Sequence, residues 1–240
     1  MNDQRRQPEQ QAPPAQKLQV RYAKRGRARF MSHRDFHRAF ERALRRAGVP
    51  MALSSGYNPH QRISFSNASP TGAATEAEYL EISLRESVAP QAVADALNQA
   101  LPDGLAVLEV VPSPPGGIAD RLQASAWEIR VVGLSRAVLE SAVAALLASD
   151  HIEVERMTKT GLRSFDARDA VIELSVTQDD ALLLISRHGT PLVRPDDIVQ
   201  ALGRVHESFI PAEPPLLMRL TQGEWDGSRI VGPFEARGEA

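Results

Sequence analysis

Three histidines near the start of the chain have types and spacings that suit metal binding or proton transfer. His33 and His37 are four residues apart, which places both on one face of a helix, and His60 follows in a loop. Three imidazoles can hold a divalent metal ion. Because imidazole exchanges protons near neutral pH, His33 or His60, with Tyr57, would suit acid–base cleavage of RNA. Two boundary histidines packed on a sheet give the same pattern, so we predict no metal site.

The loop Ser55–His60 reads SGYNPH and carries side chains that suit recognition of a nucleobase. Tyr57 and His60 can stack on a base, and Asn58 can read a base edge. We expect them to form a recognition pocket with two residues at the start of the preceding helix, Ser32 and His33. A tight turn shaped by the loop's glycine and proline is the alternative explanation.

Positive charge is concentrated around these residues. Between Lys17 and Arg62 the chain has twelve Lys or Arg and two acids, Asp35 and Glu41, a local net charge of +10. The whole chain carries −2, so the remainder carries −12. Such polarisation indicates a polyanionic partner. The residues expected to contact nucleic acid are Arg25, Arg27, Arg34, Arg38, Arg42, Arg45, Arg46, Tyr57, Asn58, His60 and Arg62.

A helix over Ser32–Gly48 must position most of these arginines. Its apolar residues share one face, and Arg34, Arg38, Arg42 and Arg45 share the opposite face, with Arg46 beside them. Ser32 and Asp35 are spaced as an N-cap and an acidic third residue, and Gly48 ends the helix. The apolar face consists of Phe36, Phe40, Ala43, Leu44 and Ala47.

Two simpler explanations of the arginine face stay open. Exposed helix faces are normally charged, and the chain has 25 Arg against 3 Lys, a bias that a GC-rich genome produces by itself. An acidic protein partner would also suit the face. A solvated face usually mixes signs, however, and this one has Glu41 as its single interior acid, which favours a nucleic acid.

The order of the predicted elements indicates an α+β fold of two tandem ferredoxin-like domains, each β-α-β-β-α-β. The first half has strands at Leu18–Ala23, Arg62–Ser66, Glu78–Arg85 and Leu105–Val111, and helices at Ser32–Gly48 and Ala89–Leu101. The second half has strands at Ala126–Val132, Ile152–Thr158, Ala170–Val176, Leu182–Ser186 and Leu216–Thr221, and helices at Ser135–Ala148 and Arg194–Val205. We therefore expect a disordered tail (1–16), domain 1 (17–111), a Pro/Gly linker (112–117), domain 2 (118–222) and a loose tail (223–240).

Composition excludes several classes of protein. The chain has no cysteine, so its own thiolates cannot form disulfides or hold zinc or an iron–sulfur cluster. No apolar run approaches the roughly 18 residues of a membrane span, and we expect a cytoplasmic protein without membrane association. Nucleotide-binding glycine loops, zinc-protease motifs and serine-hydrolase motifs are lacking, so we predict no cofactor.

Specific stretches of the chain resemble the radical-SAM-linked bacterial family of unknown function. The resemblance lies in FMSHRDFHRAFERALRRAGVPMALSSGYNPHQRISF, in SPTGAATEAEYLEISL, and later in TKTGLRSFDARDAVIEL and GTPLVRPDDIV, and it spans about residues 18–221. Members of that family occur alone or fused behind a B12-binding radical SAM protein. The resemblance implies an RNA-modification or ribosome-related context, and no assigned activity.

The sequence therefore predicts an RNA-binding accessory protein that presents a structured RNA, such as tRNA or rRNA, to a separate radical SAM enzyme. We expect no catalytic activity of its own. Two alternatives stay open: a metal-independent endoribonuclease, with His33, His60 and Tyr57 as candidate catalytic residues, and a subunit that docks an acidic protein partner. The oligomeric state is open as well.

Overall fold

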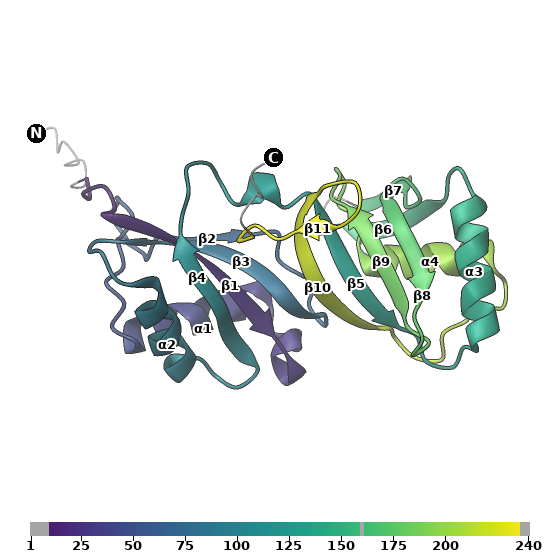
Figure 1. Ribbon diagram of the computed structural model, residues 1–240, viewed down its shortest axis with the longest axis horizontal. Helices are drawn as coiled ribbons and strands as arrows, with labels where there is room; N and C mark the ends of the chain where they lie inside the picture. Colours follow the sequence, from purple (N-terminus) through teal and green to yellow (C-terminus); the bar gives the residue numbers. More distant parts are fainter. Residues whose placement is uncertain (1–9, 159–160, 236–240) are drawn as a thin grey trace, which may run out of the picture. The chain divides into compact units, whose positions relative to one another are not determined.

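The computed structural model describes residues 10–158 and 161–235 and has a mixed α/β structure (Figure 1). In chain order its helices and strands are β1 (Gln16–Lys24), η1 (Gly26–Phe30), α1 (His33–Arg46), β2 (Ile63–Ser66), β3 (Ala74–Leu84), α2 (Pro90–Ala100), β4 (Leu105–Pro112), η2 (Ala119–Arg121), β5 (Ala124–Arg130), α3 (Arg136–Ala148), β6 (Glu153–Thr158), β7 (Gly161–Asp166), β8 (Val171–Val176), β9 (Leu182–Arg187), α4 (Pro195–Val205), β10 (Leu216–Trp225) and β11 (Ile230–Val231). No helix in these described ranges is long and apolar enough to cross a membrane.

The chain divides into two compact units. Unit 1 comprises the residues up to Ala68 and Glu78–Ile118, and unit 2 comprises Ser69–Ala77 and the residues from Ala119 onward. Strand β3 therefore begins in unit 2, where Ala74 pairs in parallel with Met218 of β10, and continues into unit 1. The predicted linker at 112–117 lies close to the boundary between Ile118 and Ala119. The assignment of Ser69–Ala77 to unit 2, in contrast, depends on a pairing between segments that are distant in the sequence.

Unit 1 has the strand order β4-β1-β3, and β2 pairs with the other edge of β3. The β1–β4 and β2–β3 pairs are antiparallel. Helices α1 and α2 cover one face of this sheet (Figure 1). Residues of β1 alternate, so Leu18, Val20 and Tyr22 enter the core with the apolar face of α1, while Lys17 and Arg21 point to the other face.

Unit 2 has the strand order β10-β5-β9-β8, with antiparallel pairing throughout this path. Helices α3 and α4 pack on one face and share a core with Trp127 and Ile129 of β5 and with Leu184 of β9. The hairpin of β6 and β7 is a separate two-stranded sheet inserted between α3 and β8. The other face of β5 is partly covered by β11, through Ile230.

Two segments differ from the sequence-based expectation. The segment between the expected strands at 152–158 and 170–176 contains a further strand, β7, whose residues are mostly exposed and so show no apolar alternation. The tail expected to be loose from 223 continues β10 to Trp225 and returns as β11, turning at Asp226, which accepts hydrogen bonds from the backbone of Ser228 and Arg229. Residues 1–9 of the expected disordered tail and residues 236–240 lie outside the described residues.

Candidate nucleic-acid interface

The ends and the buried face of α1 fix the direction of its arginines. Ser32 is the N-cap: its Oγ accepts from the Asp35 backbone N at 3.2 Å and donates to Asp35 Oδ2 at 2.7 Å, as the spacing predicted. Phe36 and Phe40 are buried, and the ring of Phe36 stacks on Tyr22 with 4.7 Å between ring centroids. The predicted apolar face is therefore the packed face, which turns the opposite face outward.

The arginines of α1 form a single-sign surface. Arg34, Arg38, Arg42, Arg45 and Arg46 are all exposed. Across the described part of the chain, the side chains of the first four make no recorded hydrogen bond or ion pair, while Arg46 donates to the carbonyl of Ala100. The two nearby acids are engaged elsewhere, Asp35 with the N-cap and Glu41 with His37 Nε2 at 3.6 Å. We call Arg34, Arg38, Arg42 and Arg45 the arginine stripe.

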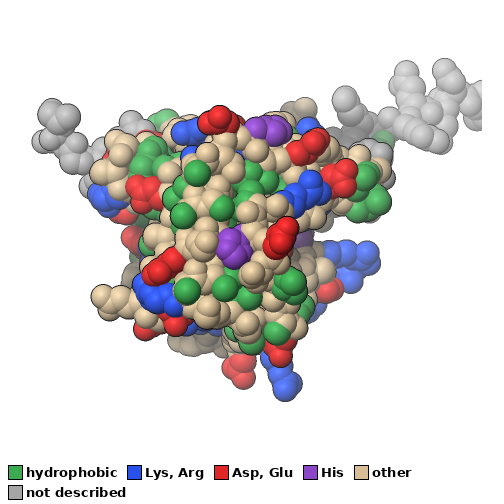
Figure 2. Space-filling view, turned by 90° about the vertical axis from the view of Figure 1, so that its right-hand side faces the viewer, with side chains coloured by type: hydrophobic (Ala, Val, Ile, Leu, Met, Phe, Trp, Pro, Cys, Tyr) green, Lys and Arg blue, Asp and Glu red, His purple; other side chains and the backbone are tan. Residues whose placement is uncertain are grey.

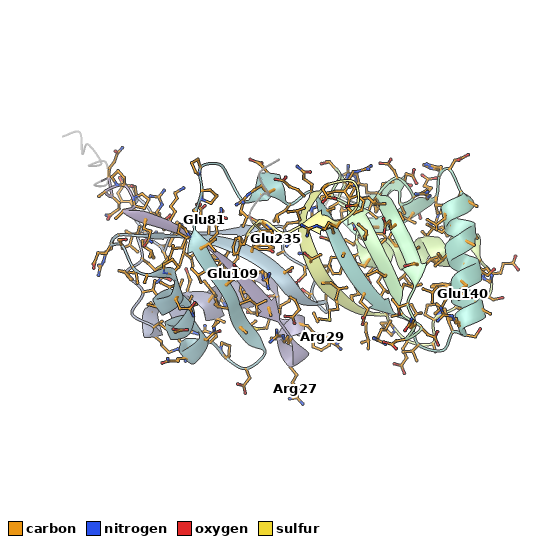
Figure 3. All side chains as sticks on the ribbon, in the orientation of Figure 1. Arg27, Arg29, Glu81, Glu109, Glu140 and Glu235 are labelled. Carbon is orange, nitrogen blue, oxygen red and sulfur yellow. The ribbon has the colours of Figure 1, made fainter. Side chains whose placement is uncertain are left out.

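Cations on the other sheet face of unit 1 are neutralised instead. Lys17 lies 3.2 Å from Glu81, and Arg21 lies 3.9 Å from Glu109. Both acids come from the sheet strands β3 and β4 (Figure 3). Arg62, which was expected in the interface, lines a cavity of about 350 Å³ on this acid-bearing side with Lys17 and Glu81. The positive charge of the sequence window is therefore divided: two of its cations face acids across the sheet, and four arginines without such acids lie together on α1.

The basic turn before α1 is the short helix η1. Arg25 directly precedes this helix and Arg27 lies in it; both are exposed, and Arg27 extends away from the ribbon (Figure 3). The guanidinium of Arg29 lies over the ring of Phe30, 4.6 Å from its centroid, and Phe30 is 60% exposed. An exposed aromatic ring beside arginines is the combination that stacks bases in single-stranded nucleic acid.

The first two histidines pack against the edge of the sheet. The rings of His33 and His37 meet Phe65 of β2 edge-on, at centroid distances of 5.0 and 4.9 Å. Within residues 10–158 and 161–235, no group of three or more His, Cys, Asp or Glu side chains is placed to hold a metal ion. His33, His37 and His60 therefore do not form a three-imidazole group, and the first two are boundary histidines.

The loop SGYNPH is closed by its own hydrogen bonds. Ser54 Oγ lies 2.8 Å from His60 Nδ1 and accepts from the His60 backbone N at 3.1 Å, and Leu53 forms a β-bridge with Gln61. Tyr57 is 70% exposed at the tip, and Asn58 is also exposed. The loop is thus a pre-formed turn that presents an aromatic ring.

The loop lies beside the C-terminal half of α1 and not beside its first turn. A cavity of about 650 Å³ joins His60 to Glu41 and Arg45 of α1, and neither Ser32 nor His33 lines it. The structure therefore brings the loop to the C-terminal half of α1, and Ser32 and His33, which were expected beside the loop, do not line this cavity. The sequence analysis missed three of its lining residues, Glu41, Gln61 and Arg85, because nothing in their local spacing marks them.

A serine and a histidine of unit 2 meet in a buried position. Ser125 Oγ lies 2.8 Å from His188 Nε2, and His188 Nδ1 lies 2.7 Å from the Leu122 carbonyl. Burial lowers the pKa of His188 to about 4, with a further lowering by Arg219 and an opposing effect of the Leu122 carbonyl. Ser125 is fully buried, so no substrate reaches this pair, and its role is to join β5 to the end of β9.

The polar residues of the β6–β7 hairpin region also have structural roles. Burial raises the pKa of Asp166, but hydrogen bonds from the backbone of Ile152 and Arg168, and the nearby His151, outweigh it and leave that pKa below its usual range. The end of unit 2 that carries α3 shows acidic and basic side chains interspersed (Figure 2). It lacks the single-sign character of the arginine stripe.

A comparison with family models gives one match on this chain. The model described as "Uncharacterized protein conserved in bacteria (DUF2344)" matches residues 17–195, a range that runs from the second residue of β1 to the first residue of α4. No curated protein matches the chain. The description of the matching model names neither an activity nor a radical SAM enzyme.

Proposed function

Because the chain belongs to DUF2344, a bacterial family described as uncharacterized, we propose its function from the site: unit 1 binds RNA through the arginine stripe and η1, in the cytoplasm. One observation carries this proposal. The guanidinium groups of the stripe are exposed, and no acid among the described residues forms an ion pair with them. Guanidinium groups bind phosphate oxygens through paired hydrogen bonds, which makes a phosphate backbone the matching partner.

Helix stability does not explain the stripe. Arg45 and Arg46 stand in the last turn, where the negative end of the helix dipole favours cations. Arg34 stands in the first turn, where the dipole disfavours a cation, and Arg38 and Arg42 lie along the middle without ion pairs across the described residues. A positive charge that does not stabilise its own helix is expected to serve a ligand.

Exposed aromatic rings favour RNA over an acidic protein as that ligand. Phe30 lies just before α1 and Tyr57 lies in the loop beside its C-terminal half, and both are largely exposed. Unpaired bases stack on such rings, and each stacked base contributes about 1–3 kcal/mol. Phosphate contacts along the helix and stacking near its two ends together suit an RNA with unpaired nucleotides.

We extend the proposal in two directions. The strand orders β4-β1-β3-β2 and β10-β5-β9-β8 support the assignment of both units as ferredoxin-like folds, the second with an inserted hairpin. The resemblance to the radical-SAM-linked family supports a role as the RNA-presenting partner of a separate radical SAM enzyme. Since this chain has no cysteine, that enzyme would supply the thiolates that hold the iron–sulfur cluster.

The experiment compares two double charge reversals in the full chain. Arg38→Glu/Arg42→Glu changes the stripe, and Arg163→Glu/Arg187→Glu makes the same change of net charge at two exposed arginines of unit 2. Fluorescence anisotropy with labelled bacterial tRNA and rRNA fragments, at matched ionic strength, should show at least tenfold weaker binding for the stripe variant. The control should change binding less than threefold.

The other outcomes separate the alternatives. An equal loss in both variants would show that net charge alone matters and would refute the stripe as the interface. Cleavage of RNA by the purified protein that disappears in His60→Ala would establish the endoribonuclease instead. Retention of an acidic protein from RNase-treated extract, lost in the stripe variant, would establish a protein partner.

A further inference from the structure

A cavity of unit 1 lies at the C-terminal end of the arginine stripe. It has a volume of about 650 Å³ and is bounded by the second half of α1, the segment after it, the end of the SGYNPH loop and Arg85. This volume falls within the range of about 300–1,000 Å³ that is typical of small-molecule sites. The cavity is built from four separate segments of one unit, so its walls are held by the packing of that unit.

One wall of the cavity is apolar. Val49 and Met51 are buried, Leu53 is 40% exposed, and Pro50 and Pro59 complete the wall. A planar ligand can therefore pack against this wall and remove apolar surface from water. Burial of this apolar surface stabilises the complex by about 25 cal/mol per Å².

Two arginines give the cavity its positive charge. Arg45 belongs to the stripe and has no recorded partner across the described residues. Arg85 pairs with Glu86 at 3.2 Å, but both side chains are about two-thirds exposed, so this ion pair is weak. Both guanidinium groups are available to a phosphate at the cavity.

A carboxylate completes the lining. Glu41 contributes it from α1, with Oε1 3.6 Å from His37 Nε2. Gln61 also lines the cavity, but its Oε1 has almost no accessible surface, so this atom does not reach a ligand. The two oxygens of one carboxylate can accept from two adjacent donors at once. His60 is held by Ser54 through Nδ1, which fixes its ring at the same cavity.

We propose that this cavity holds one guanine nucleotide of the bound RNA. The base packs on the apolar wall, its N1–H and N2–H₂ groups donate to the two carboxylate oxygens of Glu41, and its phosphate meets Arg45 and Arg85. Guanine presents two adjacent donors on its Watson–Crick edge, which match one carboxylate, whereas adenine, cytosine and uracil lack that pair. The inference rests on the proposed function, because it takes the nucleotide from an RNA chain that continues along the stripe.

The probes are the four nucleoside 5′-monophosphates, guanosine and inorganic phosphate, titrated calorimetrically into the full chain. GMP should bind at least tenfold more tightly than UMP, CMP, AMP, guanosine or phosphate. Arg85→Gln should weaken GMP binding about tenfold, and Arg187→Gln, a matched change on unit 2, should leave it unchanged. Glu41→Gln keeps the side-chain length and should reduce the preference for GMP over UMP at least threefold, with an unchanged melting temperature as the folding control.

Failure of the inference is distinguishable from failure of the proposed function. RNA binding that depends on Arg38 and Arg42, without GMP binding and without an effect of Arg85→Gln, would overturn the nucleotide site and leave the interface in place. Equal affinity for all four mononucleotides would overturn the assignment of Glu41 to the base edge. GMP that RNA does not displace would show a site for the free nucleotide and overturn the link to RNA.

Discussion

Neutralising three arginines of the stripe should change the salt dependence of RNA binding by a calculable amount. Arg34, Arg38 and Arg42 follow one another at intervals of four residues, about 6 Å along the helix axis. All three are exposed, and glutamine has a helix propensity close to that of arginine, so the triple Gln variant should keep its fold. Each lost contact with a single-stranded phosphate lowers the slope of log K against log salt by about 0.7 in magnitude.

Three lost contacts therefore reduce that slope by about 2. Between 50 and 200 mM KCl, the ratio of parent to variant affinity should shrink about 20-fold. The assay is anisotropy of a labelled RNA at four salt concentrations, with Arg163→Gln/Arg187→Gln as the control that should keep the parental slope. Parallel slopes for parent and triple variant would show that these side chains do not contact phosphate, and the stripe would then be a solvated helix face.

The structure supports three further predictions. His188 has a pKa of about 4 in the folded protein, whereas in the unfolded chain it takes up its proton near pH 6.5. The free energy of unfolding should therefore fall by about 3 kcal/mol as the pH drops from 6.5 to 4. Denaturant unfolding should show this loss in the parent protein and not in His188→Gln. Ser32→Ala removes the N-cap of α1 and should cost about 1 kcal/mol in the same assay, while Ser32→Asp should not. Gly104→Ala should lower the melting temperature and weaken RNA binding, because a Cβ there would lie 2.7 Å from the carbonyl of Arg25, the residue that precedes η1.

The sequence by itself determined the local features of the interface. Helix α1, its N-cap at Ser32, its buried face and its outward arginines follow from periodicity and capping, which act within a few residues of the chain. The turn nature of SGYNPH is likewise local, since its glycine and proline restrict the backbone directly. The Asp-Gly pair at 226–227 was also a readable hairpin signal, and overlooking it led to the expectation of a loose tail.

Only the tertiary structure decided which of these features meet. Strand β2 places Phe65 against His33 and His37, and the loop before it reaches Glu41 and Arg45 and not the first turn of α1. Lys17 and Arg21 face acids of β3 and β4, whereas the arginines of α1 do not. This difference depends on how β1 pairs with β3 and β4 in the sheet. Gln61 and Arg85 enter the cavity for the same reason: long-range strand pairing and helix packing set which distant residues become neighbours, and local sequence patterns carry no information about that choice.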